Sequence, residues 1–184
     1  MNTNISRRNF VKAGAVAGMG LGLAACGGNS GSSNGSSSDT IKIGLMGPYT
    51  GDVAQYGLAC RYGAELYVKQ VNSNGGINGK QIELDTQDEK GDATEAVNVY
   101  NKLVEDGVVG IIGDVTSTPT IAVAQASVKD NMPCVTPSAT AADVISYGKN
   151  YFRACITDPY QGKLMADFAA DQGYKTVGVI YNQG

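Results

Sequence analysis

The sequence predicts an α/β fold in which a mostly parallel β-sheet is flanked by helices. From residue 40 onward, short apolar runs alternate with segments whose apolar residues recur at helical spacing. Strands that alternate with helices in this way pair in parallel and place helices on both faces of the sheet. The expected strands are residues 41–46, 81–86, 108–112, 133–136, 151–155 and 176–181. The expected helices are residues 58–72, 93–106, 121–130, 142–147 and 160–172.

Local signals support individual elements of this alternation. Asp92 with Glu95 three residues later predicts a capping box at the start of helix 93–106, and Gly107 suits its end. The uninterrupted apolar run 108–112 is typical of a parallel strand that is buried on both faces. The chain from residue 40 therefore reads as successive βα units.

The turn at residues 113–120 contains several hydroxyl side chains between a strand and a helix. Thr118 is expected to be the N-cap of that helix, with Pro119 at its first position. A helix N-terminus presents free backbone N–H groups and the positive end of the helix dipole, so it can bind an anion. Ser117 and Thr118 add hydroxyls that can bind a carboxylate, and the alternative is that they only cap the helix. A second hydroxyl-rich strand end, at residues 136–140, favours binding.

The candidate pocket combines three strand ends, because ligands in open α/β sheets bind beyond the carboxyl ends of the strands. These ends are an expected loop at residues 47–57 with Tyr56, the turn with Ser117, and the turn with Ser138 and Thr140. Hydroxyls, free N–H groups and an aromatic wall suit a carboxylate with a neighbouring ammonium, held without a reaction. The alternative for Tyr56 is an ordinary core aromatic.

The composition argues against an enzyme and against a metal site. The chain has no His, so a zinc site or a Cys/His catalytic site lacks its usual parts. An α/β hydrolase or transferase that uses Ser117 is the weaker alternative. Ser117 lies in no Gly-x-Ser-x-Gly motif, and no plausible general base accompanies it, since the chain has no His and the nearest carboxylate in sequence is Asp114. No GxGxxG follows a strand, which argues against a nucleotide-binding Rossmann domain. We expect no cofactor. The acidic residues Asp85, Asp88, Glu89 and Asp92 do not match an EF-hand and are expected to form a solvated loop.

The N-terminal region predicts export and a lipid anchor. Residues 1–25 combine the pair Arg7 and Arg8 with a short apolar stretch, as in a twin-arginine signal peptide. The sequence Leu-Ala-Ala-Cys that ends at Cys26 resembles a bacterial lipobox, which predicts cleavage before Cys26 and a lipid on its sulfur. Residues 26–39 then form a Gly/Ser-rich tether that holds the domain near a membrane without inserting it.

Charge and cysteine content set two further limits. Removal of Arg7, Arg8 and Lys12 with the signal leaves 11 basic and 17 acidic residues, a net charge of −6, which argues against nucleic acid as a partner. With Cys26 assigned to lipid, an odd number of cysteines remains. One pair with a free thiol, a pair with a residue beyond 184, or small core residues are the alternatives for Cys60, Cys134 and Cys155.

Taken together, several stretches resemble the extracytoplasmic substrate-binding proteins of branched-chain amino-acid ABC transporters, the leucine/isoleucine/valine type. The resemblance covers residues 40–184 and is specific only as a set. It is carried by residues 43–48, 53–57, 71–79, 110–113 and 136–140, together with Phe152, Arg153 and Asp158. It implies a type I periplasmic-binding fold with two lobes that close about a hinge. Residues 40–158 would be the first lobe and residues 159–184 only the start of the second, so we expect a fragment.

The resemblance also implies roles for individual residues. Ser117 would hold the α-carboxylate of the ligand, Ser138 would offer backbone atoms, and Thr140 would bind main-chain groups of the ligand. Tyr56 would line the side-chain pocket, and Ala139 belongs to the same predicted set. The family often has alanine where this chain has Ser138, and the extra hydroxyl could change which ligand fits.

The function that follows is that of a monomeric, lipid-anchored receptor that delivers an amino acid, branched-chain or similar, to an ABC permease. It would lie on the outer face of the cell membrane or in the periplasm. Its mechanism would be hinge closure on the ligand. Amides, urea or small organic acids are alternative ligands, and a ligand-sensing module of the same fold is an alternative role.

Overall fold

The structure is a computed structural model, and it describes residues 40–181. The predicted signal peptide, the lipid on Cys26 and the tether to residue 39 lie outside the described residues. In chain order the elements are β1 (Ile41–Gly47), α2 (Ala54–Ser73), β2 (Ile82–Asp88), α3 (Ala93–Glu105), β3 (Ile111–Ile112), α4 (Ser117–Ser127), β4 (Cys134–Thr136), the 3-10 helix η1 (Ala142–Ile145), β5 (Tyr151–Arg153) and α5 (Asp158–Asp171).

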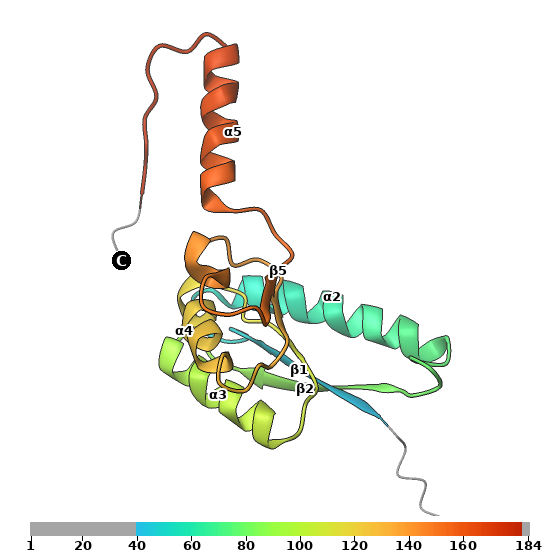
Figure 1. Cartoon of the computed structure of the whole chain (residues 1–184). Helices are drawn as coiled ribbons and strands as arrows, with labels where there is room; N and C mark the ends of the chain where they lie inside the picture. Colours follow the sequence, from blue (N-terminus) through green and yellow to red (C-terminus); the bar gives the residue numbers. More distant parts are fainter. Residues whose placement is uncertain (1–39, 182–184) are drawn as a thin grey trace, which may run out of the picture. The chain divides into compact units, whose positions relative to one another are not determined.

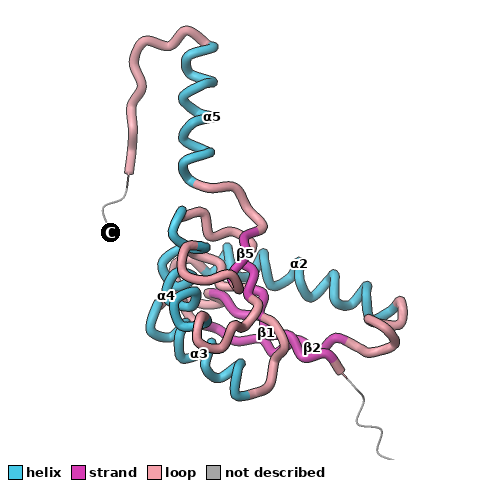
Figure 2. Tube along the Cα trace, in the orientation of Figure 1, coloured by secondary structure: helices cyan, strands magenta, loops and turns pink. Residues whose placement is uncertain are grey.

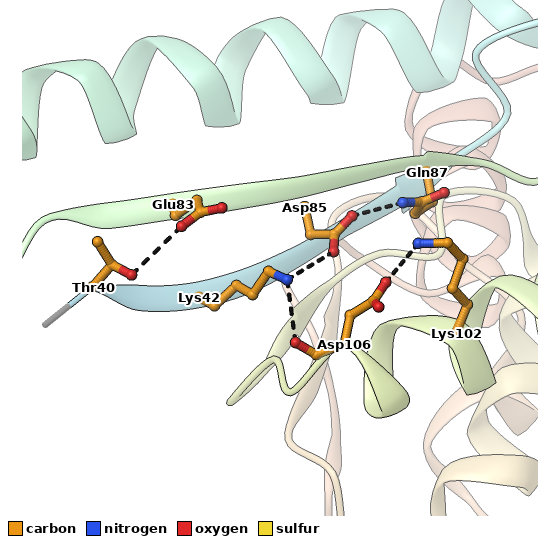
Figure 3. A network of polar contacts seen from close by, with 7 residues as sticks. All are labelled: Thr40, Lys42, Glu83, Asp85, Gln87, Lys102 and Asp106. Carbon is orange, nitrogen blue, oxygen red and sulfur yellow. Dashed lines mark hydrogen bonds and ion pairs between the residues drawn. The ribbon is translucent and has the colours of Figure 1, made fainter. Parts of the chain in front are cut away.

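The five strands form one parallel sheet in the order β2-β1-β3-β4-β5. β1 lies in its interior, where Gly44 pairs with Asp85 on one side and with Ile111 on the other. Because β2 and β3 flank β1 on opposite sides, α2 and α3 lie against opposite faces of the sheet (Figure 1, Figure 3). The predicted parallel α/β sheet is confirmed, and its strand order changes direction at β1.

The hydrophobic core lies on the face of the sheet that α3 and α4 cover. Tyr100 and Leu103 of α3 and Val123 of α4 are completely buried there against Met46 and Ile111. The Tyr100 hydroxyl is also hydrogen-bonded to the Asp130 carboxylate, 2.9 Å away, so its polar end is satisfied. On α2, by contrast, only one residue is buried, and Tyr62, Leu66 and Tyr67 are exposed.

Helix α3 begins and ends as its sequence predicts. The Asp92 carboxylate accepts hydrogen bonds from the N–H groups of Thr94 and Glu95, at 2.8 and 2.9 Å. Gly107 has the positive φ of +78° that a residue just past a helix end often takes. The predicted N-cap at Asp92 and the end at Gly107 are confirmed. The reciprocal bond of a capping box does not form, because the Asp92 N–H donates to the Glu89 carbonyl at 3.0 Å instead.

Other predicted boundaries are wrong. α2 begins at Ala54 instead of residue 58, so Tyr56 lies in a helix and not in a loop. The run 108–112 contributes only the two-residue strand Ile111–Ile112, although the Val109 N–H still donates to the Lys42 carbonyl of β1 at 2.9 Å. α4 begins at Ser117 and ends at Ser127, earlier than predicted at both ends.

The last predicted strand does not form in the described structure. Residues 176–181 run as an exposed loop after α5, as Figure 2 shows, because no other described segment pairs with them. The preceding helix α5 has no buried residue either, although a Thr157 cap bonded to the Tyr160 N–H begins it normally. Helix α5 and residues 176–181 therefore have the sequence pattern of a second α/β unit, but they lack the packing that would bury its apolar side chains.

Two predictions about polar and sulfur-containing side chains are corrected. Glu89, expected in a solvated loop, is fully buried. Cys60, Cys134 and Cys155 are free thiols, so no disulfide joins any two of them. Cys134 is a core residue as one alternative held, whereas Cys155 lies beyond the end of β5 and is half-buried. Residues 40–181 contain no cluster of three or more His, Cys, Asp or Glu side chains that could hold a metal.

A surface network ties the amino-terminal half of β1 to β2 and to the end of α3 (Figure 3). The Lys42 ammonium lies 3.4 Å from the Asp85 carboxylate and donates to the Asp106 carbonyl at 3.1 Å. Lys102 pairs with the Asp106 carboxylate at 2.5 Å. These partly exposed pairs lie toward the end of the sheet opposite to the carboxyl ends of its strands. No helix within residues 40–181 is both long and apolar enough to span a lipid bilayer.

Candidate functional site

The candidate site lies where the strand order reverses, beyond the carboxyl ends of β1, β3 and β4. In doubly wound sheets this point leaves a crevice, because the chain leaves neighbouring strands toward opposite faces. Gly47 ends β1 there, and a Cβ on it would lie 2.8 Å from Cγ2 of Val115. The turn after β3 is therefore packed directly against the end of β1.

The N-terminus of α4 lies at these strand ends and has no side-chain cap. Thr116 is the N-cap, with extended backbone angles, and its side chain makes no capping hydrogen bond. Thr118 and Pro119 are thus the second and third helical residues, so both position assignments made from the sequence are wrong. Within the described residues, the N–H groups of Ser117 and Thr118 donate to no protein acceptor. An uncapped helix start of this kind can bind an anion.

Two hydrogen bonds join this helix start to the turn after β4. The Ser138 hydroxyl donates to the Val115 carbonyl at 2.7 Å, and the Ala141 N–H donates to the Ser117 hydroxyl at 3.3 Å. Ser117 and Ser138 thus lie close together, as the sequence predicted. The extra hydroxyl of Ser138 is engaged by the protein itself, so it connects the two turns.

Ala139 and Thr140 occupy different environments in the same turn. The Ala139 side chain is buried, and its N–H donates to the Thr136 hydroxyl at 3.0 Å. Thr140 is half-buried, and its hydroxyl has no hydrogen-bond partner among residues 40–181. Of these two, Thr140 is therefore the one with a polar side chain available to a ligand.

Tyr56 lies in the first turn of α2 and is 55% exposed, so the alternative of a core aromatic is wrong. Cys60 lies one helical turn further along α2. Burial raises the pKa of the Cys60 thiol, and a hydrogen bond to the Ser138 side chain partly offsets that rise in pKa. This contact brings the beginning of α2 next to the turn after β4, with Tyr56 on the same stretch of helix.

The sequence analysis did not predict the pair of buried carboxyl groups near the candidate site. Glu89 and Asp114 are both fully buried. Burial raises the pKa of Asp114 to about 7. Burial, together with the charge of Asp114, raises the pKa of Glu89 to about 8. Glu89 follows a strand in an acidic, lysine- and glycine-containing stretch that looks solvated, so the sequence holds no signal for its burial.

Comparisons with known proteins agree with this architecture. A sequence model described as periplasmic binding protein matches residues 40–184. The chain belongs to this family. The leucine-, isoleucine-, valine-, threonine- and alanine-binding protein of Pseudomonas aeruginosa is 41% identical over 147 residues, which is 79% of this chain and 39% of that protein. The Leu/Ile/Val-binding protein of Escherichia coli is 32% identical over 141 residues, 76% of this chain and 38% of that protein.

Solved structures of periplasmic binding proteins show the same fold. A branched-chain amino acid transporter substrate-binding protein from Streptococcus pneumoniae, in complex with isoleucine, has a TM-score of 0.70 and 35% identity over 72% of this chain and 38% of its own. A solute-binding protein from Rhodopseudomonas palustris, in complex with 3,4-dihydroxybenzoic acid, has a TM-score of 0.69 and 25% identity over 74% and 38%. The chain thus spans about two fifths of the length of these relatives.

Proposed function

We propose that this protein is the substrate-binding receptor of an ABC importer and that it captures a branched-chain or similar amino acid. The observation that carries the proposal is the uncapped start of α4, whose free N–H groups lie beside the turn with Thr140. A carboxylate can accept from the Ser117 and Thr118 N–H groups and from the Ser117 hydroxyl. The relatives named for leucine, isoleucine and valine binding support this choice of ligand.

The proposed geometry holds a ligand and catalyses nothing. The Thr140 hydroxyl can accept a hydrogen bond from the ligand ammonium. The Tyr56 ring is exposed toward solvent and offers an apolar wall to the ligand side chain. The Ala139 N–H is bonded to the Thr136 hydroxyl within its own turn, and the Ser138 hydroxyl holds the two turns together through the Val115 carbonyl. A second lobe that closes over the ligand would make additional contacts with it, and these contacts would stabilise the closed state.

A small aromatic acid is the second candidate ligand. Two related structures hold such acids, 3,4-dihydroxybenzoic acid in one protein with 25% identity and benzoate in another with 28% identity. The carboxylate is common to both ligand classes, and the start of α4 would bind it in either case. The ammonium, which only the amino acid carries, separates them, and Thr140 is the residue that would respond to it.

The remaining parts of the proposal concern location and partners. The predicted lipid on Cys26 would anchor the exported protein to the outer face of the membrane. A Gly/Ser tether of residues 27–39 would let the folded part reach the permease. The acidic mature chain would act as a monomer, and its second lobe, from about residue 159, would share the ligand.

Calorimetric titration of the complete mature protein, with Cys26 replaced by serine, tests the proposal. The panel holds L-leucine, L-isoleucine, L-valine, L-threonine, leucinamide and benzoate. We expect micromolar or tighter binding of a branched-chain amino acid, about −8 kcal/mol or better.

Ser117→Ala should weaken the binding of that amino acid by about tenfold, because a hydrogen bond to a charged group is lost. Lys102→Met, a change at the opposite end of the sheet, is the control. A folded protein that binds benzoate and no amino acid would support the second candidate.

A further inference from the structure

Arg153 forms a bridge across the turn that carries the proposed ligand group. It is the last residue of β5, where it pairs with Thr136 of β4. Its guanidinium donates from Nη1 to the Thr140 carbonyl at 2.7 Å and from Nη2 to the Ala142 carbonyl at 3.3 Å. One side chain thus holds two carbonyls of the segment that follows β4.

The bridge depends on the shape of the guanidinium and not on an ion pair. Within residues 40–181 no carboxylate lies within ion-pair distance of Arg153. Its Nε is buried without an acceptor, which costs free energy that the two carbonyl bonds must offset. A planar fork reaches two fixed acceptors at once, whereas a lysine ammonium on a flexible stem does not hold them in one plane.

The same turn is joined to the chain segment that leads into α5. The Thr140 carbonyl accepts a second hydrogen bond, from the Asp158 N–H at 3.1 Å. The Cys155 thiol donates to the Ala139 carbonyl at 3.4 Å. The Thr140 backbone is therefore fixed from two sides, by the end of β5 and by the start of α5.

We propose that Arg153 is a positioning residue, which holds the Thr140 turn in the conformation that presents the Thr140 hydroxyl to the ligand. This inference rests on the proposed function, because it assigns Arg153 to the same site. Without the bridge, the Thr140 carbonyl keeps the Asp158 N–H as a partner but loses its fixed direction. The turn then orders only when the ligand arrives, and the ordering cost lowers the affinity.

A double-mutant cycle separates positioning from general destabilisation. Calorimetry with L-leucine compares the wild type, Arg153→Lys, Thr140→Ala and the double variant, with Lys102→Met, a change at the opposite end of the sheet, as the control. We expect Arg153→Lys alone to weaken binding by about tenfold and to have little further effect when Thr140 is already alanine. Equal effects of Arg153→Lys in both backgrounds would overturn the proposal. A wild type that binds no amino acid would contradict the proposed function instead.

If the wild type binds no amino acid, a measurement without ligand still tests whether Arg153 positions the turn. Amide hydrogen exchange reads the Ala141 and Asp158 N–H groups, whose acceptors are the Ser117 hydroxyl and the Thr140 carbonyl. In Arg153→Lys and Arg153→Met, both amides should exchange about tenfold faster, while the amides of α3 keep their rates. Unchanged exchange at Ala141 and Asp158 in a folded variant would show that Arg153 does not position the turn. If Arg153→Met fails to fold, Arg153→Lys alone decides.

Discussion

The buried pair Glu89 and Asp114 shows how a polar group is accommodated beneath the site. Neither side chain is exposed, and no cation of the described residues lies within ion-pair distance of them. One carboxylate oxygen of Asp114 accepts from the Val115 N–H, and one of Glu89 accepts from the Gly91 N–H at 2.8 Å. The other oxygen of each has no hydrogen-bond partner within residues 40–181. Two buried carboxylates without a cation are expected to keep a proton near neutral pH.

This pair makes the stability of the protein depend on pH above the ordinary carboxyl range. In the folded protein burial raises the pKa of Asp114 to about 7 and that of Glu89 to about 8. The unfolded chain releases the same protons at about pH 4. Between these values the folded state binds more protons, so this contribution to the free energy of unfolding falls as pH rises and levels off above about pH 8.

Glu89→Gln should therefore flatten the pH dependence. The amide keeps an acceptor for the Gly91 N–H but carries no titrating proton. Urea unfolding at about pH 5 and about pH 8 measures the slope. The wild type should lose more stability between these two points than Glu89→Gln does. Glu105→Gln removes an exposed carboxylate of α3 and should keep the slope of the wild type. Equal slopes for wild type and Glu89→Gln would contradict a proton held by buried Glu89.

Ser138 illustrates how a side chain of the candidate site can act through the protein itself. Its hydroxyl donates to the Val115 carbonyl, so Ser138→Ala removes one neutral hydrogen bond between the two turns. We expect the free energy of unfolding to fall by about 1 kcal/mol. Affinity for an amino acid should change less than in Ser117→Ala, because only Ser117 faces the proposed carboxylate. Paired urea unfolding and calorimetry test this, and a larger loss of affinity in Ser138→Ala would place its hydroxyl on the ligand.

At the level of elements, α2 shows where tertiary contact decides a boundary. The sequence predicts a loop at residues 47–57 and the start of the helix at residue 58. In the structure Gly57 is a helical residue that faces the loop after β1. A Cβ there would lie only 2.0 Å from the Pro48 carbonyl oxygen. The helix can begin at Ala54 because glycine leaves room for that carbonyl.

Gly57→Ala should consequently destabilise the protein despite the better helix propensity of alanine. The contact with the Pro48 carbonyl forces the helix or the loop to move, and overpacking of this kind costs about 1–3 kcal/mol. Gly63→Ala is the matched control on the same helix, where a Cβ would meet nothing within 4 Å. That variant should gain about 0.5–1 kcal/mol. Urea unfolding of the two variants measures both effects, and loss of stability in both would point to the helix itself and not to Pro48.

The elements that the sequence predicts well are those with local signals. Asp92 and Gly107 mark the ends of α3 correctly, and the parallel alternation follows from apolar runs and helical spacing. The length of β3 and the absence of a strand at residues 176–181 depend on which strands pair, and the local sequence does not determine that pairing. At the site, adjacency of the turns with Ser117 and Ser138 was predictable from parallel topology. The burial of Glu89 and the bridge from Arg153 to the Thr140 and Ala142 carbonyls were not, because both depend on how the folded chain brings these groups together.

At the scale of the whole molecule, the site is a consequence of the sheet topology. The reversal of strand order at β1 brings together the start of α2, the start of α4 and the turn after β4. Each of these segments supplies a different kind of group: an aromatic ring, free N–H groups and a hydroxyl. The proposed binding of a zwitterion would draw on all three segments, so ligand binding and folding would be linked.

Ligand should therefore stabilise the folded protein as a whole. A ligand that binds only the assembled site raises the free energy of unfolding by about 2.7 kcal/mol at a concentration of 100 times its Kd. Urea unfolding of the complete mature protein, with and without L-leucine, should show this shift in midpoint with an unchanged slope. In Ser117→Ala the same leucine concentration should give a smaller shift, because it then represents fewer multiples of Kd. In Lys102→Met, altered only in the network at the other end of the sheet, the full shift should remain. A leucine shift that persists undiminished in Ser117→Ala would place the ligand away from the start of α4.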